Sequence, residues 1–304
     1  MAVLVQPWPR TEAYLPTCTM AVRHAPSLVE GSPPAVLVHG LGGSSLNWTD
    51  LMGLMRAKVD VWAPDLGGFG ASPPPRDGDM SPSGYAGNLA EFIEQDLRGE
   101  PVHLLGNSMG GAVALQLAAR RPDLVRTLTL ISPALPALHA TRGNVHLPVI
   151  AVPGVGERLV PRYAAVAAEA RVKATIDACF ANPKRLPEQR MAEAIAETKA
   201  RDEYPYAAEA FLRALRGLLK TFLDASADRP WKLAERVTCP TLVVYGRKDP
   251  LIDTRAAHRV TRHFADARVI VLPDCGHIAQ MEHPELVFQA WQRLVSSADR
   301  AAGS

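Results

Sequence analysis

The stretch "LLGNSMGGAVAL", residues 104–115, holds one serine between an apolar run typical of a strand and an apolar run typical of a helix. A buried serine without a partner is unfavourable by roughly 1–3 kcal/mol. Residues 106–110 match the pattern G-x-S-x-G, in which small residues permit a sharp strand-to-helix turn that exposes the serine hydroxyl. The pattern predicts that Ser108 is a nucleophile. A serine that merely caps the helix is the alternative.

A serine nucleophile needs a base, and the base needs an orienting carboxylate. His277 lies in "PDCGHIAQMEHPE", a loop that follows an expected strand, where catalytic groups of α/β proteins collect. Asp249 lies in "VVYGRKDPLID", directly after another expected strand. Asp253 is a rival for the acid, although it is equally well explained as the N-cap of the next helix. The order Ser108, Asp249, His277 along the chain favours a catalytic triad.

The developing negative charge of an acyl-transfer reaction needs backbone N–H donors. "VHGLGGSS", residues 38–45, is an expected strand that ends in a glycine-rich loop, so its backbone can approach a ligand closely. We predict that the N–H groups of Leu41 and Met109 form an oxyanion hole. A simple glycine turn is the structural alternative for this loop.

Apolar runs and helical patterns alternate along most of the chain. The runs are continuous, as expected for parallel strands that are covered on both faces. The sequence therefore predicts an α/β fold with a doubly wound, mostly parallel sheet. Strands are expected at 35–39, 59–64, 102–107, 125–132, 241–246 and 267–272, and helices at 47–56, 81–98, 109–120, 253–264 and 284–298. Residues 18–25 are expected to add an antiparallel edge strand.

One segment interrupts the alternation. Between residues 132 and 229 no strand is expected, and helical patterns occur at 156–181, 187–203 and 206–224. We predict a core in two parts, 1–133 and 231–304, with a helical cap at 134–230. An independent helical domain is the alternative. Apolar residues of the segment should pack on the core or on one another, and a minority should line an acyl pocket; the candidates are Phe180, Phe211, Leu215 and Phe222.

Composition restricts the partners. The chain has 304 residues, of which 47% are hydrophobic and 21% charged, which is typical of a globular protein. A formal net charge of +2 gives no reason to expect nucleic acid or an acidic membrane as partner. No apolar run is long enough to span a bilayer, and prolines near the N-terminus argue against an export signal. Four scattered cysteines predict no disulfide frame and no metal site, and favour a cytoplasmic location. The oligomeric state is left open.

Several motifs together resemble the α/β-hydrolase superfamily over nearly the whole chain. They are "HGLGG", "PDLGGFGAS", "GNSMGG", "GRKDPLID" and "GHIAQMEHP". The resemblance implies a serine hydrolase in which Ser108 is the nucleophile, His277 the base and Asp249 the acid. It also implies oxyanion amides at Leu41 and Met109, and a lid formed by the inserted segment.

The resemblance leaves three functions open. Hydrolysis of carboxylic esters with small or medium acyl groups, which needs neither metal nor organic cofactor, is the first. "GNSMGG" and "GHIAQMEHP" are similar to carbon–carbon hydrolases of aromatic ring-fission products. Those enzymes usually carry an HGGGPG stretch and an aromatic residue after the histidine, where this chain has "HGLGGSS" and Ile278. A ligand-binding protein without turnover is the third. Epoxide and haloalkane hydrolases use an aspartate nucleophile, so Ser108 argues against them.

Overall fold

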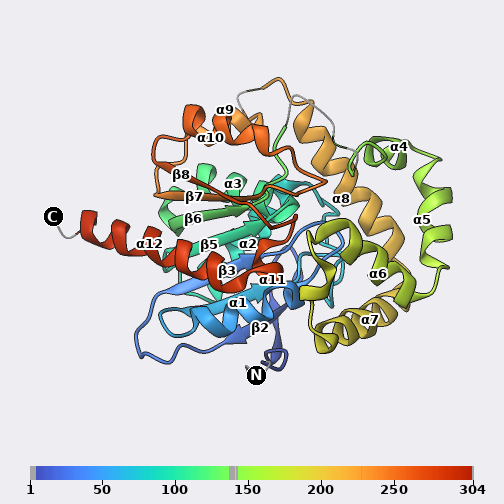
Figure 1. Ribbon diagram of the computed structural model, residues 1–304, viewed down its shortest axis with the longest axis horizontal. Helices are drawn as coiled ribbons and strands as arrows, with labels where there is room; N and C mark the ends of the chain where they lie inside the picture. The colour runs from blue at the N-terminus through green and yellow to red at the C-terminus, as the bar shows by residue number, and fades with distance from the viewer. Residues whose placement is uncertain (1–4, 137–140, 142, 227, 303–304) are drawn as a thin grey trace.

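The computed structural model describes residues 5–136, 141, 143–226 and 228–302. Its centre is an eight-stranded sheet with the strand order β1-β2-β4-β3-β5-β6-β7-β8 (Figure 1). Strands β3 to β8 run parallel to one another, whereas β2 is antiparallel to both of its neighbours, β1 and β4. The strands are β1 (Arg10–Tyr14), β2 (Thr19–Ala25), β3 (Pro34–Val38), β4 (Asp60–Pro64), β5 (Val102–Asn107), β6 (Val125–Ile131), β7 (Thr241–Gly246) and β8 (Ala267–Leu272). The predicted fold class is confirmed.

Helices cover both faces of the sheet. One layer contains α1 (Thr49–Met55), α11 (Ala279–Glu282) and α12 (Pro284–Ala302). The other contains α2 (Pro82–Gln95), α3 (Met109–Arg120), α9 (Pro230–Ala234) and α10 (Ala257–His263). Short 3-10 turns are η1 (Ser45–Trp48), η2 (Pro122–Leu124), η3 (Pro183–Arg185) and η4 (Thr254–Ala256). This is the doubly wound arrangement that the alternating pattern predicts.

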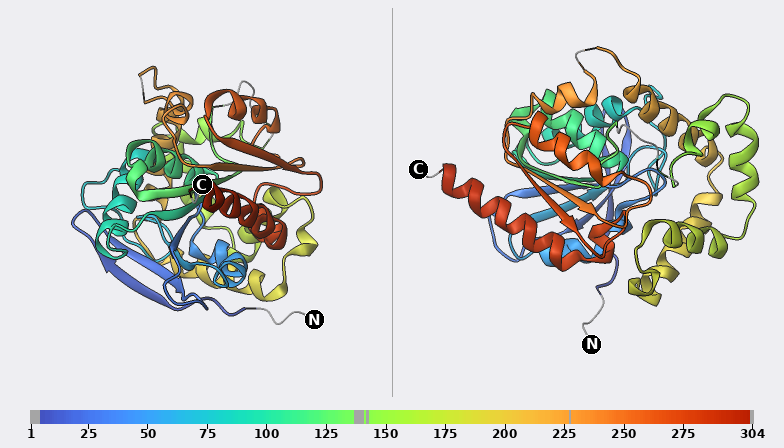
Figure 2. Two further views of the ribbon diagram at one scale, coloured as in Figure 1. Left: turned by 90° about the vertical axis from the view of Figure 1, so that its left-hand side faces the viewer. Right: turned by 45° about the horizontal axis from the view of Figure 1, so that its top comes forward.

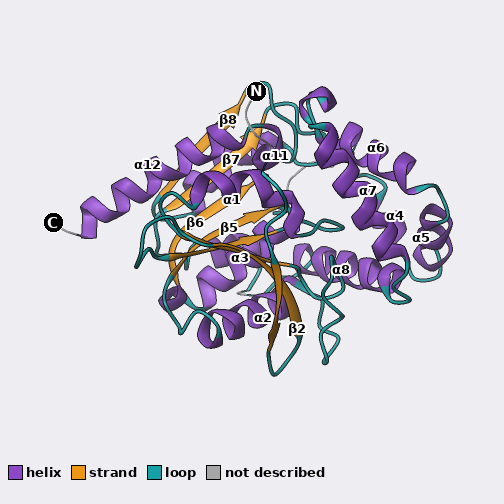
Figure 3. Ribbon diagram, turned by 90° about the horizontal axis from the view of Figure 1, so that it is seen from below, coloured by secondary structure: helices purple, strands orange, loops and turns teal. Residues whose placement is uncertain are grey.

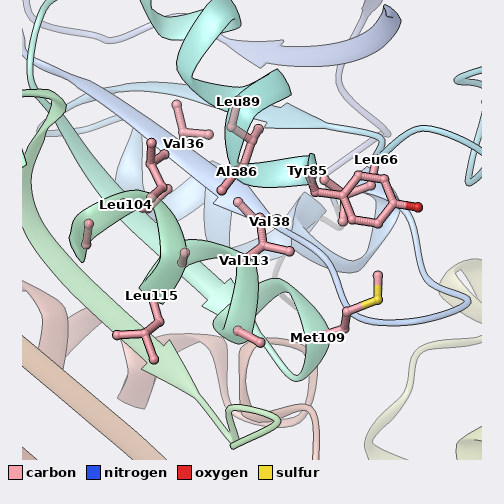
Figure 4. Close-up of a cluster of buried hydrophobic side chains, with 14 of the residues drawn as sticks. Val36, Val38, Leu66, Tyr85, Ala86, Leu89, Leu104, Met109, Val113 and Leu115 are labelled. Atoms are coloured by element: carbon pink, nitrogen blue, oxygen red, sulfur yellow. The ribbon is translucent and has the colours of Figure 1, made fainter. Parts of the chain in front are cut away.

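The two layers explain why the strands are apolar without alternation. Along β3, Val36 and Val38 belong to the core beneath α2 and α3, whereas Ala35 and Leu37 belong to the core beneath α1 and α12. Figure 4 shows the first of these cores, with Val36 and Val38 close to Leu89 of α2 and Val113 of α3. Both faces of β3 are therefore buried, and successive side chains must all be apolar.

Six α-helices lie between β6 and β7 in the described residues, of which the last, α9, belongs to the layer of α2 and α3 and the first five form an insertion. We call α4 (Leu147–Ala151), α5 (Gly156–Ala164), α6 (Ala168–Cys179), α7 (Glu188–Asp202) and α8 (Ala207–Phe222) the helical insertion. No strand occurs between β6 and β7 in the described residues. The insertion lies at one end of the sheet, opposite the free end of α12 (Figures 2 and 3). The pattern expected at 156–181 is divided into α5 and α6. Boundaries at residues 133 and 230 remain a prediction.

The edge of the sheet differs from the expectation. Residues 18–25 contain the antiparallel strand β2, but β2 pairs with β1 on one side and β4 on the other. The edge strand is β1, with the sequence "RTEAY", of which only Ala13 is buried. An exposed edge strand needs no apolar pattern, so its sequence carries little strand signal. None of the described helices is both long and apolar enough to cross a membrane.

Candidate active site

Ser108 stands at the turn from β5 into α3. Its backbone has φ 56° and ψ −120°, in the positive-φ region that a residue with a side chain rarely adopts. The turn is held by two hydrogen bonds: the Ser108 N–H donates to the Ile131 carbonyl at 3.0 Å, and the Ala134 N–H donates to the Ser108 carbonyl at 2.9 Å. The Ser108 side chain makes no capping hydrogen bond to α3, so the helix-cap alternative fails.

The glycines of the motif are required by close backbone contacts. A Cβ on Gly110 would lie 2.2 Å from the Val38 carbonyl oxygen, and one on Gly106 would lie 2.3 Å from the Gly110 carbonyl oxygen. Strand β3, strand β5 and the start of α3 thus meet where no side chain fits. The two glycines let the turn at Ser108 sit tightly on the sheet.

His277 and Asp249 come together at the ends of β8 and β7. The Nδ1 atom of His277 lies 2.9 Å from Oδ2 of Asp249, whose side chain is fully buried. The other oxygen, Oδ1, accepts hydrogen bonds from the N–H groups of Leu251 at 2.8 Å and Ile252 at 3.0 Å. Burial acts to raise the pKa of Asp249, but the charge and hydrogen bond of His277 and the Ile252 N–H outweigh it and leave the pKa below its ordinary value. Asp249 is therefore a buried carboxylate that holds one ring nitrogen of His277.

Asp253 makes different contacts. Its side chain accepts a hydrogen bond from the Arg255 N–H at the start of η4, at 3.0 Å. It also forms an ion pair with the Arg255 guanidinium at 2.9 Å. These are the helix-capping contacts that the sequence offered as the alternative explanation.

Asn107 is a site residue that the sequence analysis did not single out. Its Nδ2 donates to the Ile131 carbonyl at 3.0 Å and to the His277 carbonyl at 3.1 Å. One amide thus ties the turn that carries Ser108 to the loop that carries His277. Because it occupies a variable position of G-x-S-x-G, the motif gave no signal for this role.

The loop that contains Leu41 is supported by a buried histidine. His39 Nδ1 donates to the Gly40 carbonyl at 2.8 Å, and His39 Nε2 accepts from the Leu66 N–H at 2.9 Å. Burial lowers the pKa of His39, which agrees with a neutral ring that both donates and accepts. Leu41 faces the same cavity as Ser108. Met109 begins α3, so its N–H is one of those that the helix itself leaves unpaired.

Ser108, His277 and Leu41 line one cavity of about 630 Å³ between the sheet and the helical insertion. This volume suits a small organic molecule. Phe211, Leu215 and Phe222 of α8 line its apolar part, as the sequence analysis expected of a minority of the inserted residues. Phe180 packs instead with Val172 and Ile176 of α6.

Two charged residues of α7 also face the cavity, and no sequence motif identified them. Arg201 Nη1 donates to the Gly42 carbonyl at 2.7 Å, which ties the insertion to the glycine-rich loop. Glu197 is the other. Burial and the charge of Asp65 raise the pKa of Glu197 to about 7, against the opposing effects of the Ser44 hydroxyl, Arg201 and Arg23.

A stability measurement tests the environment of Glu197. The folded protein keeps this proton up to about pH 7, whereas the ordinary value is 4.5. Between these values the folded state binds more protons than the unfolded state, so stability falls as pH rises through the window. Glu197→Gln removes this loss, so the Tm of the variant should rise relative to the original protein from pH 5 to pH 8. Glu188→Gln, at an exposed position of the same helix, is the control. A Tm difference independent of pH contradicts the raised pKa.

Comparison with known proteins places this site in a family. The family profile described as the alpha/beta hydrolase fold matches residues 33–284, which span the glycine-rich loop, the turn at Ser108 and the His277 loop. The chain belongs to the α/β-hydrolase fold family. Within the described ranges of this α/β-hydrolase, no group of three or more His, Cys, Asp or Glu side chains could hold a metal ion.

Its relatives differ in their named activities. Over 270 residues the α/β-hydrolase is 32% identical to the dihydrolipoyllysine-residue acetyltransferase component of the acetoin cleaving system of Pseudomonas putida. That match covers 86% of this chain but only 62% of the relative's length. The chain is 27% identical to a 2-hydroxymuconate semialdehyde hydrolase of Pseudomonas putida, over 88% of both chains. A solved structure of a thermophilic esterase from Thermogutta terrifontis shares the fold, with TM-score 0.71, 22% identity and coverage of 95% of this chain and 99% of the other. Family membership therefore leaves the substrate open.

Proposed function

We propose that this α/β-hydrolase is a serine hydrolase that cleaves carboxylic esters of small or medium acyl groups through an acyl-enzyme. One observation carries the proposal. The buried Asp249 carboxylate lies 2.9 Å from Nδ1 of His277, and the histidine faces the same cavity as the turn at Ser108. With the proton on Nδ1 shared with Asp249, the other ring nitrogen is left as an acceptor. Such a ring can take a proton from a hydroxyl in the cavity.

Acylation follows from this arrangement. The Ser108 hydroxyl attacks the ester carbonyl carbon while its proton passes to Nε2 of His277. The carbonyl oxygen becomes an oxyanion, which we assign to the N–H groups of Leu41 and Met109. Asp249 stabilises the imidazolium that forms. When the tetrahedral intermediate collapses, the carbon–oxygen bond to the leaving group breaks, and Nε2 returns the proton to the departing alcohol.

Deacylation repeats these steps with water. His277 Nε2 takes a proton from a water molecule, whose oxygen attacks the acyl carbon on Ser108. The same two N–H groups hold the second oxyanion. Collapse breaks the bond between Ser108 Oγ and the acyl carbon, releases the carboxylic acid and returns the proton to Ser108. The cycle consumes one ester and one water and requires neither metal nor organic cofactor.

Carbon–carbon bond hydrolysis is the second candidate, because "GNSMGG" and "GHIAQMEHP" are similar to such hydrolases. The 2-hydroxymuconate semialdehyde hydrolase of Pseudomonas putida, which aligns with 88% of this chain, is a relative that agrees with this interpretation of the motifs. The short "HGLGGSS" stretch and Ile278 favour the ester reaction. The test is to assay purified protein against a series of p-nitrophenyl esters and against a dienol ketone, followed by absorbance. A kcat/KM for the dienol ketone above that of every ester overturns the proposal. A ligand-binding protein without turnover would leave Ser108 unlabelled by a fluorophosphonate probe.

We also propose that the helical insertion acts as a lid and that the protein works in the cytoplasm. Apolar residues of α8 line the cavity opposite Ser108, which supports a lid that excludes water from the reaction. The four cysteines are all free, which agrees with a reducing compartment.

Phe222 provides a test of the acyl pocket. Its side chain lines the cavity from the C-terminal end of α8, so Phe222→Ala enlarges the apolar part without touching Ser108, Asp249 or His277. We expect the preferred acyl chain to lengthen, with kcat/KM for the best short ester falling about tenfold. The rate of labelling by a small fluorophosphonate should change by less than about twofold. Equal losses in both assays would show that Phe222 supports the reactive groups and not the acyl chain.

A further inference from the structure

The outer side of the helical insertion exposes a cluster of large apolar side chains. Over the described residues, eleven large hydrophobic side chains are exposed, and six of them lie between residues 145 and 166. We call these six the apolar face: Val145, Val149, Val152, Leu159, Tyr163 and Val166, with exposed fractions between 40 and 55%. Single exposed apolar residues are ordinary, but a cluster of this kind marks an interaction surface.

The spacing of these residues supports one continuous surface. The first three and the last three each follow the spacing i, i+4, i+7 in the sequence, and each set has its middle residue in a helix. Val149 lies in α4, and Leu159 and Tyr163 lie in α5, while the other three lie in the turns and bends beside these helices. Helices α4 and α5 contact each other, and both pack on α8. Figures 1 and 3 show α5 at the outer margin of the molecule, on the side of the insertion that is farthest from the sheet. The apolar face is thus turned away from the core that it would otherwise stabilise.

The charged residues beside the apolar face indicate which kind of partner it binds. Arg158 and Arg162 are exposed on α5 beside the apolar face, and neither forms an ion pair within the described part of the chain. The only carboxylate on α5, that of Glu157, already pairs with Arg216 at 2.8 Å. An apolar helix face flanked by unpaired arginines fits an anionic lipid surface, which accepts apolar side chains between its headgroups and attracts the cations. A second copy of this face would instead bring like charges together.

The apolar face also borders the cavity. Tyr163 belongs to both, and His146, Leu147 and Pro148 of the same segment line the cavity as well. A molecule held in a lipid layer against α5 would lie next to side chains that line the pocket.

We propose that the apolar face docks this protein on anionic lipid surfaces and that its substrate enters the cavity from the lipid phase. Docking stands independently of catalysis, whereas entry of an ester from the lipid rests on the proposed hydrolase function. The net charge of +2 for the whole chain gives no sign of this surface, because binding depends on the local positive charge of Arg158 and Arg162.

Vesicle co-sedimentation with the full-length protein tests docking. Vesicles of phosphatidylcholine with 30% phosphatidylglycerol are compared with phosphatidylcholine alone, at low salt. We expect binding to the anionic vesicles, and a loss of about tenfold or more in Leu159→Glu because a charge replaces an inserted apolar side chain. Leu286→Glu is the matched control, since Leu286 is 44% exposed and Leu159 40% exposed, but Leu286 lies on α12. It should bind as the original protein does.

The arginines give a second variant that leaves the apolar side chains intact. Arg158→Gln combined with Arg162→Gln should weaken binding to anionic vesicles by about fivefold for each arginine removed, and raised salt should have a similar effect. This variant keeps docking testable if Leu159→Glu fails to fold, which its circular dichroism would reveal. The proposal is overturned if the original protein does not bind anionic vesicles. It is also overturned if Leu159→Glu and the double arginine variant both bind these vesicles as strongly as the original protein does. A dimer by light scattering that Leu159→Glu converts to monomer would assign the face to self-association, and overturns it as well.

Catalysis is measured separately. Ser108→Ala should bind vesicles as the original protein does, because docking needs no turnover. Leu159→Glu should keep its activity toward a water-soluble short ester but lose at least about tenfold toward an ester embedded in anionic vesicles. If the original protein binds vesicles but hydrolyses no ester in any assay, the proposed hydrolase function is refuted and the docking proposal stands.

Discussion

Replacing Ser108 with alanine is expected to lower kcat for ester hydrolysis by about 10⁴- to 10⁶-fold, because no other hydroxyl is proposed to attack the carbonyl. Alanine meets the same positive φ as serine, and the Ser108 side chain makes no capping hydrogen bond that the change would remove. The Tm should therefore change little. Steady-state kinetics with a p-nitrophenyl ester measures the loss, and mass spectrometry after fluorophosphonate treatment should find the label on Ser108 in the original protein only.

Combining Ser108→Ala with His277→Ala provides the internal control. If the residues act as one unit, the double variant should be hardly slower than either single variant. Activity of Ser108→Ala within tenfold of the original protein would refute the mechanism. Additive losses would show that His277 acts elsewhere.

Asp249→Asn is expected to lower kcat by about 10⁴-fold, because the asparagine stabilises the tautomer of His277 that cannot accept a proton at Nε2. The Leu251 and Ile252 N–H groups donate to Oδ1 of Asp249 at 2.8 and 3.0 Å, so the asparagine oxygen should remain with them. The new NH₂ group then faces Nδ1 of His277 and can only donate. The ring proton is forced onto Nε2, where the mechanism needs an acceptor.

Asp253→Asn is the matched control, four residues along the same loop. Its side chain accepts a hydrogen bond from the Arg255 N–H, and asparagine is as good an N-cap as aspartate. We expect a loss in kcat of less than about threefold. A severe loss in Asp253→Asn with a mild one in Asp249→Asn would move the acid to Asp253.

Local chemistry explains which features could be predicted from the sequence. The turn at Ser108 is encoded within five consecutive residues, and β5 and α3 begin and end where the pattern predicts. The strand before Asp249 and the strand before His277 are equally plain apolar runs, so both loops could be assigned to the same sheet edge. Strands β7 and β8 are neighbours in the sheet, which brings Nδ1 of His277 within 2.9 Å of Oδ2 of Asp249.

Other features depend on contacts between distant segments, for which the sequence has no local signal. Asn107 bonds the His277 carbonyl across 170 residues, and Arg201 bonds the Gly42 carbonyl across 159. The pKa of Glu197, on α7, depends on Asp65, which follows strand β4. The exposure of the apolar face could not be predicted from the sequence either, because amphipathic helices are normally expected to bury their apolar side. Only the packing of α4 and α5 on α8 reveals which side remains outside.

The position of the helical insertion also determines when the sheet and the candidate site can be completed during synthesis. Strands β6 and β7 pair directly, with Ile131 opposite Val244, yet residues 132–240 separate them in the chain. A long connection costs little at equilibrium, since each doubling adds about 0.6 kcal/mol of closure entropy. During synthesis, however, β7 leaves the ribosome about 5–20 s after β6 at ordinary elongation rates. In that interval β6 has an open edge, and the five inserted helices must be made before it is covered. Ser108 has been synthesised by then, but Asp249 and His277 follow only with the last two strands. Under the proposed mechanism, a nascent chain should therefore not hydrolyse esters before its sheet is complete.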